Sequence, residues 1–294
     1  MIWITGARGM LGRELYRYLE KQGIPCVGSG KEVDILDPDA LKAFVCHKDI
    51  DWVVNCAAYT DVDGAEEEES LAFRLNAAGP ENLARLCAET GSRFIHISSD
   101  YVFDGSGSRP YLETDPVSPM GAYARSKAEG ERRVMAACPE AIILRTAWLY
   151  GRYGNNFVYT MVRLMNEVPQ IGVVADQKAC PTWSRDLAET IAALLQKPGV
   201  PAGLYHIAGS GETSWYGFAQ EIYRCGRELG LISKTCALHA LKTAEYPTKA
   251  IRPAYSVLDM NKIALLGLTT PAWTDSLRVF LEEECKNPHA CLLA

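Results

Sequence analysis

The sequence lacks any apolar run long enough to span a bilayer. Its first apolar run passes at once into a glycine-rich turn, and it has neither the charged n-region nor the longer apolar core of a signal peptide. We therefore expect a soluble, cytoplasmic protein without a membrane partner. The formal net charge of −6 also argues against a nucleic-acid partner, because the far field is repulsive.

Metal-type and disulfide-type cysteine patterns are absent as well. The ten cysteines include no CxxC pair and no Cys/His cluster at zinc spacing. Several, such as Cys56 and Cys87, fall inside apolar runs, so we expect small, buried, reduced thiols. The acidic run 66–69 lies at a helix start, where negative charge suits the dipole, and we interpret it as a solvated face rather than a metal site.

The first half of the chain alternates short apolar runs with helical patterns. Leu11, Leu15 and Leu19 recur at i, i+4 and i+8, which is typical of one helix face. Further helical patterns cover residues 38–46, 71–86 and 123–137. The expected strands are residues 2–4, 26–28, 52–54, 94–97 and 142–144. Strands that are apolar throughout and alternate with helices predict an α/β fold of the Rossmann type, with a doubly wound parallel sheet.

The pattern changes after residue 150. Loops rich in Gly, Asn and Pro then separate shorter elements. We expect a dinucleotide-binding domain over residues 1–150, with its sheet extended by residues 170–175 and 203–208. Residues 151–294 are expected to form, for the most part, a small substrate-binding lobe.

A glycine-rich turn follows the first strand. TGARGMLG places Gly6, Gly9 and Gly12 between a strand and a helix that begins near Met10. A dinucleotide pyrophosphate needs close backbone approach and free N–H groups, which this turn and the helix N-terminus supply. In this strand–turn–helix context the turn predicts cofactor binding, against the simpler interpretation of a structural tight turn.

The end of the second strand bears on the choice of cofactor. An acid there would bind the ribose hydroxyls of NAD, and a basic residue would accommodate the extra phosphate of NADP. The sequence VGSGKEVD shows no acid at the strand end, with Ser29 and Lys31 nearby. We therefore predict NADPH, with NADH as the alternative, although Lys31 also fits a solvated loop lysine. Asp34 and Ile35 are expected to contact the adenine.

Tyr123 and Lys127 are four residues apart on a helix, so they share one face. An ammonium held near a phenol lowers its pKa, which would suit Tyr123 to deliver a proton to a carbonyl oxygen. Ser98 and Ser99 end the preceding strand, where open α/β sheets place ligand-binding groups. We choose Ser99 to bind the substrate oxygen, with Ser98 in reserve; capping or a turn is the alternative role for both.

Three further residues have two interpretations each. Asn76, inside a long helical pattern, fits either a surface position or a kinked helix or water relay that helps to hold the lysine. The small residues Cys56-Ala57-Ala58 follow the third strand, as required where cofactor lies against backbone. Trp148 fits either the floor of a sugar site or a core position.

Taken together, these motifs resemble the dTDP-4-dehydrorhamnose reductase family of extended short-chain dehydrogenases/reductases. The resemblance covers nearly the full length and rests on TGARGMLGREL, NCAAYTDVDGAE, ISSDYVFDG, YARSKAEGE, RTAWLYG, GNNFVYTM, DQKACPT, GLYHIAGSGETSWYGFA and RPAYSVLD. It implies reduction of the C4 keto group of dTDP-4-dehydro-L-rhamnose to dTDP-L-rhamnose by a monomer or homodimer.

The resemblance also implies residue roles. The catalytic residues are Ser99, Tyr123 and Lys127. The cofactor-binding residues are Gly6, Ala7, Gly9, Met10, Leu11, Gly12, Lys31, Asp34, Ile35, Cys56, Ala57, Ala58, Tyr59, Asn76, Tyr123 and Lys127. The substrate-side residues are Val62, Ser98, Ser99, Asp100, Tyr101 and Trp148, with Asn156, Pro181, Thr182 and Arg252 toward the nucleotide diphosphate, where a guanidinium pairs well with phosphate.

Departures from the family pattern leave other features open. Ala124 and Gly64 stand where glycine and lysine are common, and Cys180 replaces a frequent glycine. Some members hold magnesium with glutamates at a dimer contact; Arg185 stands at one such position, so magnesium and that dimer stay open. The alternatives in function are another nucleotide-sugar reductase, a 4-epimerase that retains its NAD, and a non-catalytic protein resembling the regulatory subunit of methionine adenosyltransferase.

Overall fold

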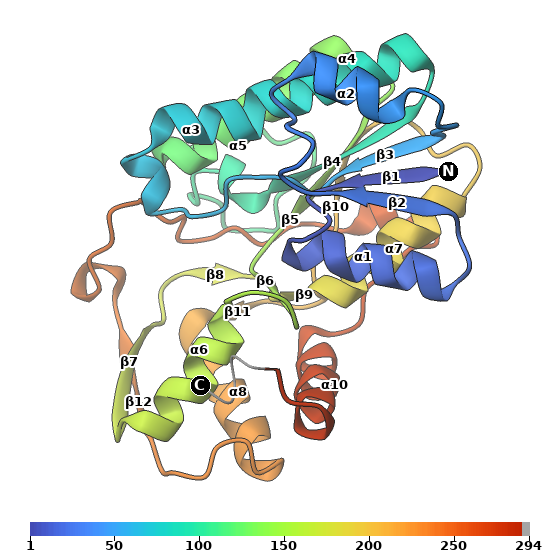
Figure 1. The fold of residues 1–294 in the computed structure, drawn as a ribbon. Coiled ribbons are helices and arrows are strands. Elements are labelled where there is room, and N and C mark those ends of the chain that lie inside the picture. Colours follow the sequence, from blue (N-terminus) through green and yellow to red (C-terminus); the bar gives the residue numbers. More distant parts are fainter. Residues whose placement is uncertain (290–294) are drawn as a thin grey trace.

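Six parallel strands form the central sheet of the computed structural model, which describes residues 1–289 (Figure 1). Their order is β10 (Gly203–His206), β5 (Ile142–Thr146), β4 (Arg93–Ser99), β3 (Trp52–Asn55), β1 (Ile2–Thr5) and β2 (Cys26–Ser29). The chain moves from β1 to β2 in one direction and from β1 to β3 and β4 in the other. The order therefore reverses beside β1, and this confirms the doubly wound Rossmann-type prediction.

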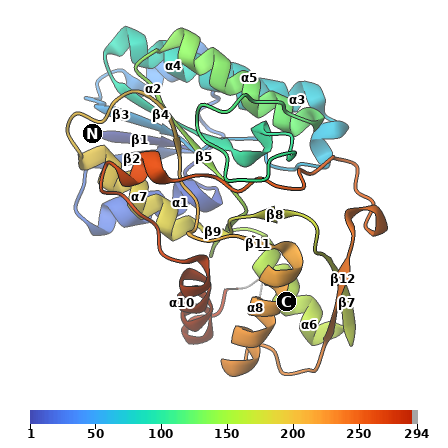
Figure 2. The same cartoon turned by 180° about the vertical axis from the view of Figure 1, so that it is seen from behind.

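Helices cover both faces of this sheet (Figures 1 and 2). One face carries α1 (Met10–Lys21) and α7 (Ser184–Gln196); the other carries α2 (Pro38–Val45), α4 (Gly79–Thr90) and α5 (Gly121–Ala137). Ile2 and Ile4 pack in the core beneath α1, while Trp3 packs in the core beneath α4. Successive residues of β1 thus enter different cores, as the two-residue period of a strand requires.

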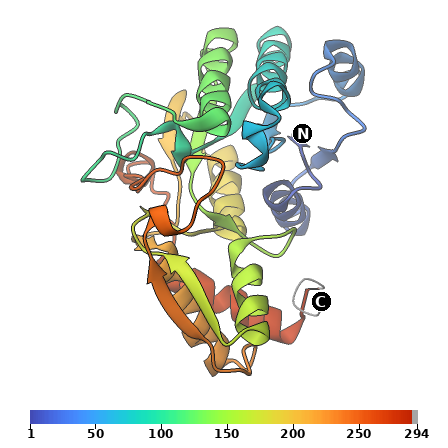
Figure 3. The same ribbon diagram turned by 90° about the vertical axis from the view of Figure 1, so that its left-hand side faces the viewer.

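A smaller lobe lies below the carboxyl end of the sheet (Figure 3). It contains α6 (Phe157–Glu167), β7 (Gln170–Val174), α8 (Trp215–Glu228), β12 (Ala237–Leu241) and α10 (Trp273–Lys286), which share a separate hydrophobic core. The expectation that residues 170–175 extend the main sheet is wrong, because β7 pairs with β12 and buries Val173 against the lobe. The expectation for residues 203–208 is correct, since β10 pairs with β5.

Short elements complete the chain. They are η1 (Gly64–Glu66), α3 (Glu69–Phe73), the π-helix η2 (Arg74–Ala78), η3 (Asp100–Val102), β6 (Leu149–Tyr150), β8 (Lys178–Ala179), β9 (Thr182–Trp183), β11 (Thr213–Ser214), η4 (Thr243–Glu245) and α9 (Asn261–Ala264). β6 pairs with β9, and β8 pairs with β11. Because α7 and β10 return to the main sheet, the second half of the chain contributes to both parts of the molecule.

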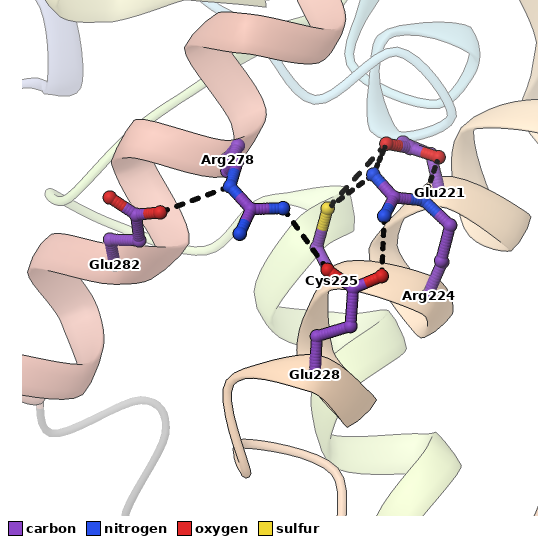
Figure 4. A network of polar contacts seen from close by, with 6 residues as sticks. All are labelled: Glu221, Arg224, Cys225, Glu228, Arg278 and Glu282. Carbon is purple, nitrogen blue, oxygen red and sulfur yellow. Dashed lines mark hydrogen bonds and ion pairs between the residues drawn. The ribbon is translucent and has the colours of Figure 1, made fainter.

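Ion pairs join α8 to α10 on the surface of the lobe (Figure 4). Glu228 accepts hydrogen bonds from Arg224 at 2.5 Å and from Arg278 at 3.0 Å. Arg278 also reaches Glu282 within α10 at 3.1 Å. All these side chains are substantially exposed, so solvent screens their attraction and the packing of the lobe core holds the two helices together.

The nine cysteines within residues 1–289 are all free thiols, and Cys291 lies outside the described residues. Cys87, Cys138, Cys180, Cys225 and Cys236 are buried, as expected. Cys46, which follows α2, is exposed, and Cys26, Cys56 and Cys285 are only half-buried, so the expectation of burial is wrong for these four. No helix in the described part of the chain is long and apolar enough to cross a membrane.

Candidate functional site

The glycine turn after β1 packs tightly against the loop after β3. Gly6 has a φ of +65°, and a Cβ at Gly6 would come within 2.6 Å of the Ala57 backbone nitrogen. A Cβ at Gly12 would come within 2.3 Å of the Gly6 carbonyl oxygen. Gly9 is the N-cap of α1 and brings no side chain to its first turn, so the N–H groups there stay available to an anion.

A cleft of about 560 Å³ opens beside this turn. The predicted residues that line it are Gly6, Gly9, Lys31, Asp34, Ile35, Cys56, Ala57 and Ala58. Sequence reasoning missed Arg8, Gly30, Val33, Leu36 and Leu75, which also line it. Ala7, Met10, Leu11, Gly12, Tyr59 and Asn76 are not among its lining residues; Leu11, for example, is buried in the core beneath α1. The cleft fits a dinucleotide whose pyrophosphate meets α1.

Ser29 ends β2, so the strand end carries no acid, but Glu32 follows in the next loop. Glu32 folds back, so that its carboxylate accepts a hydrogen bond from the Gly30 N–H at 2.7 Å and pairs with Arg8 at 3.2 Å. The Gly30 N–H is the main cause that lowers the pKa of Glu32. The pair was missed because Glu32 is three residues beyond the strand and Arg8 lies in another loop.

Ser99 and Tyr123 meet at the carboxyl edge of the sheet. Ser99 is the last residue of β4, Tyr123 lies in the first turn of α5, and the Ser99 hydroxyl hydrogen-bonds the phenol. That hydrogen bond lowers the pKa of Tyr123, but burial outweighs it and raises the pKa to about 12. The expected fall in the Tyr123 pKa is therefore wrong, and the phenol keeps its proton at neutral pH.

Lys127 lies one helical turn beyond Tyr123 and is only 2 % exposed. Its ammonium donates a hydrogen bond to the Ile97 carbonyl oxygen at 2.6 Å. Burial lowers the pKa of Lys127 to about 8, while Glu131 and Cys56 oppose the fall. The charge of Lys127 opposes the rise that burial causes in the pKa of Cys56, a residue that lines the cofactor cleft.

Ser98 faces away from Tyr123 and is held by a buried network. Its hydroxyl donates to Glu131 at 2.5 Å, and Glu131 also pairs with Arg145 through contacts of 2.8 and 2.6 Å. Ser98 thus donates its single hydrogen to a carboxylate, and its role as the reserve for Ser99 stays a prediction.

Asn76 lies in the π-helix η2 and is fully buried. It accepts from the Tyr59 N–H at 2.8 Å and donates to the Tyr59 carbonyl at 3.0 Å. It also donates to Ser126 at 3.0 Å. Asn76 thus holds the loop after β3, and a kink or water relay that helps to hold Lys127 stays a prediction.

The expected substrate-side residues divide into open and buried ones. Val62 and Tyr101 are half-buried, and the Tyr101 ring stands edge-on to Tyr123 at 5.8 Å between centroids. Trp148 has a φ of +42° and stacks on Trp215 at 3.5 Å. Asp100, in contrast, is 2 % exposed and accepts hydrogen bonds from Ser99 at 3.0 Å and Ser256 at 2.6 Å. The substrate-side role of Asp100 stays a prediction.

A second cavity of about 530 Å³ lies between α6, β7 and the loop after β12. Phe157 and Trp215 give it aromatic walls, and Arg252 supplies its guanidinium. Arg252 pairs with Asp63 at 2.6 Å, and its charge opposes the rise that burial causes in the pKa of Tyr101.

Asn156, Pro181 and Thr182 support the loops rather than line this cavity. Asn156 caps α6 by accepting from the Tyr159 N–H at 3.2 Å. Thr182 is fully buried and accepts from the Gly209 N–H at 3.2 Å. Their placement toward the nucleotide diphosphate stays a prediction.

Arg185 donates two hydrogen bonds of 2.6 Å to Glu283. Burial raises the pKa of the nearby Glu14, and the charge of Arg185 opposes that rise. A guanidinium therefore already provides positive charge among the glutamates of this surface. These residues do not fit a divalent cation, and no reaction step is assigned to one.

Comparison with known proteins gives a consistent result. The chain matches the family described as RmlD substrate binding domain over residues 1–285. It is 43% identical over 273 residues to dTDP-4-dehydrorhamnose reductase of Mycobacterium tuberculosis, covering 90% of this chain and 87% of the relative.

Two crystal structures of proteins of the same name superpose on the chain. The protein from Clostridium acetobutylicum has a TM-score of 0.89 at 39% identity. The protein from Bacillus anthracis, determined in complex with NADP, has a TM-score of 0.90 at 36% identity. Each comparison covers 96% of this chain and 98% of the other.

Proposed function

This chain belongs to the RmlD substrate-binding-domain family, and we propose that it reduces the C4 keto group of dTDP-4-dehydro-L-rhamnose to give dTDP-L-rhamnose. The observation that carries the proposal is the meeting of Ser99 and Tyr123 at the carboxyl edge of the sheet, with Lys127 one helical turn beyond Tyr123. A scaffold protein would not require that arrangement.

The protein's own groups have distinct tasks in this reaction. Tyr123 delivers its phenolic proton to the keto oxygen, and its high pKa keeps that proton available at neutral pH. Ser99 donates a hydrogen bond to the same oxygen and so stabilises the negative charge that develops there. The Lys127 ammonium stabilises the phenolate left after proton transfer.

The cofactor cleft supports NADPH, with NADH as the alternative. A bound nicotinamide cofactor supplies the hydride for the keto carbon. The N-terminus of α1 binds the pyrophosphate, and Ala57 and Ala58 allow the cofactor to lie against backbone. Arg8 and Lys31 provide positive charge for the 2′-phosphate of NADPH. The relative from Bacillus anthracis, crystallised with NADP, supports this assignment.

The second cavity suits the nucleotide end of the substrate. Its aromatic walls, Phe157 and Trp215, can stack on a pyrimidine, and Arg252 can pair with the diphosphate. The sugar then extends past Tyr101 toward Tyr123, with Val62 and Trp148 on its flanks. We expect the protein to act in the cytoplasm as a monomer or homodimer, which stays a prediction.

The other candidate functions have less support. The structural neighbours that bind UDP-sugars are about 18% identical and show the fold alone. A regulatory subunit would bind a dinucleotide without turnover. Neither alternative is favoured by the relatives at about 40% identity.

The test is to supply dTDP-4-dehydro-L-rhamnose and NADPH to the purified protein and to identify the product by mass spectrometry and NMR. We expect one dTDP-L-rhamnose for each NADPH oxidised. A protein that binds NADPH but forms no product would contradict the proposed substrate, and NAD retained through purification and turnover would indicate an epimerase instead.

A further inference from the structure

The helix that carries Tyr123 has no side-chain cap of its own. The first N–H groups of any α-helix lack an acceptor within the helix. In α5 the N-cap residue, Met120, makes no capping hydrogen bond, and the first turn contains no acidic residue. The acceptor comes instead from Glu66 in η1, 56 residues earlier, whose Oε1 accepts a hydrogen bond from the Ala122 N–H at 2.7 Å. This carboxylate also brings negative charge to the positive end of the helix dipole.

The backbone of α5 is shaped to receive that carboxylate. Gly121 has a φ of +79°, which L side chains rarely adopt, and a Cβ there would come within 2.7 Å of Glu66 Oε1. A larger residue at position 121 would therefore displace the contact. Tyr123 is the next residue after Ala122, so the hydrogen bond from Ala122 fixes the backbone directly beside the proposed proton donor.

η1 also packs against the same turn of α5. Ala65 and Ala122 are buried in one small cluster with Ala72, and the Tyr123 side chain packs against this cluster. Ala65 is the neighbour of Glu66. The packing of Ala65 and the hydrogen bond to Glu66 thus hold η1 against the first turn of α5 through two adjacent residues.

Glu66 is exposed, but a second set of contacts anchors its segment. Asp63, which precedes η1, accepts hydrogen bonds from the Ala250 N–H at 2.9 Å and from the Arg252 guanidinium at 2.6 Å. Both partners belong to the chain after η4, which runs from the lobe to the neighbourhood of α3 (Figures 1 and 2). η1 is therefore held by α5 and by the segment that brings Arg252 to the second cavity.

We infer that Glu66 is a positioning residue for the reduction: by capping α5 from outside the helix, its carboxylate sets where Tyr123 stands relative to Ser99 and the keto oxygen. The inference rests on the proposed function and adds a residue to the same site. Glu66 acts through the backbone at Ala122 and needs no contact with the substrate.

Glu66→Ala removes the acceptor and leaves the Ala122 N–H without it. We expect kcat to fall by about 10- to 100-fold, the cost of displacing a reacting group by roughly 1 Å. NADPH affinity should be unchanged, because other residues line the cofactor cleft. Proton transfer from a displaced phenol is slower, so it should limit turnover more strongly, and the solvent deuterium isotope effect on kcat should rise. A mere loss of folded protein would lower kcat without changing this isotope effect.

Two further variants separate the cap from a general loss of charge. Glu66→Gln should restore kcat, because its side-chain oxygen can accept the same hydrogen bond. Glu69→Ala is the matched control, since Glu69 belongs to the same acidic run and also contacts α5, through Arg125 at 2.8 Å, with both side chains about half exposed. Solvent screens that ion pair, so the control should keep the wild-type kcat and isotope effect.

Amide hydrogen exchange tests the cap without any substrate. The Ala122 N–H should exchange faster in Glu66→Ala than in the wild type, Glu66→Gln or Glu69→Ala, because its acceptor is gone. Equal exchange in Glu66→Ala and the wild type would overturn the inference, as would an unchanged kcat or a fall in kcat that Glu66→Gln does not reverse. Failure of the wild type to reduce the sugar would instead count against the proposed substrate, and the exchange of the Ala122 N–H would still decide whether Glu66 caps α5.

Discussion

Replacing Arg145 with Met should destabilise the protein far more than replacing a surface arginine, because it leaves a charge unpaired in the interior. Arg145 lies on β5, its partner Glu131 lies on α5, and their side chains are only 2 % and 8 % exposed. Two hydrogen bonds of 2.8 and 2.6 Å join the fork of the guanidinium to the carboxylate. Ser98 adds a third contact to the same carboxylate.

The expected magnitude follows from this burial. Removing one partner of a buried pair costs about 3–5 kcal/mol, because the remaining charge loses both its solvent and its counter-charge. Arg145→Met should therefore lower the free energy of unfolding by about that amount. Removing both charges, in Arg145→Met with Glu131→Gln, should cost clearly less than the sum of the two single changes.

Urea or guanidinium denaturation followed by circular dichroism measures both effects. Arg163→Met is the matched control, because Arg163 pairs with Glu167 one turn along α6 while both side chains are nearly half exposed. The control should lose less than about 1 kcal/mol. Equal losses for Arg145→Met and Arg163→Met, or additive effects in the double variant, would refute the assignment of Arg145 and Glu131 as a coupled buried pair.

Two further predictions concern the cofactor cleft and the response to acid. Arg8→Ala should weaken NADPH binding by about tenfold, the contribution of roughly one charge-assisted hydrogen bond, and should have little effect on NADH binding. Glu32→Gln should strengthen NADPH binding, because it removes the carboxylate that competes for Arg8. A fluorescence titration in which both cofactors are equally affected would count against this role of Arg8. Burial lowers the pKa of His206 to about 3, so the unfolded chain binds a proton below pH 6.5 that the folded protein does not. The free energy of unfolding should fall as pH drops from 6.5 toward 3, by up to about 2 kcal/mol between pH 7 and 5. In His206→Gln this free energy should depend less steeply on pH. An unchanged dependence on pH would contradict the assignment.

The sequence predicted the main sheet well because its strands are buried on both faces. Runs such as Trp52-Val53-Val54 are apolar throughout, and the helices between them leave a parallel sheet as the consistent arrangement. The same signal failed for β7. An apolar run does not reveal its pairing partner, and β12, more than sixty residues away in the chain, was not recognised as a strand.

At the site, the residue types were easier to predict than their hydrogen bonds. The spacing of Tyr123 and Lys127 on one helix and the position of Ser99 at a strand end follow from local geometry. The burial of Asp100 depends on Ser256, which is 156 residues away, and no local pattern indicates it. The pairing of Arg8 with Glu32 likewise depends on how two loops meet.

The most direct test of the central proposal compares the wild type with Tyr123→Phe in NADPH oxidation driven by dTDP-4-dehydro-L-rhamnose. The substitution removes only the phenolic oxygen, so NADPH binding should be preserved while turnover falls by about 10² to 10⁴, the range expected for loss of a general acid. That result would establish both the reduction and the proton donor. Wild-type turnover that Tyr123→Phe leaves intact would contradict the account.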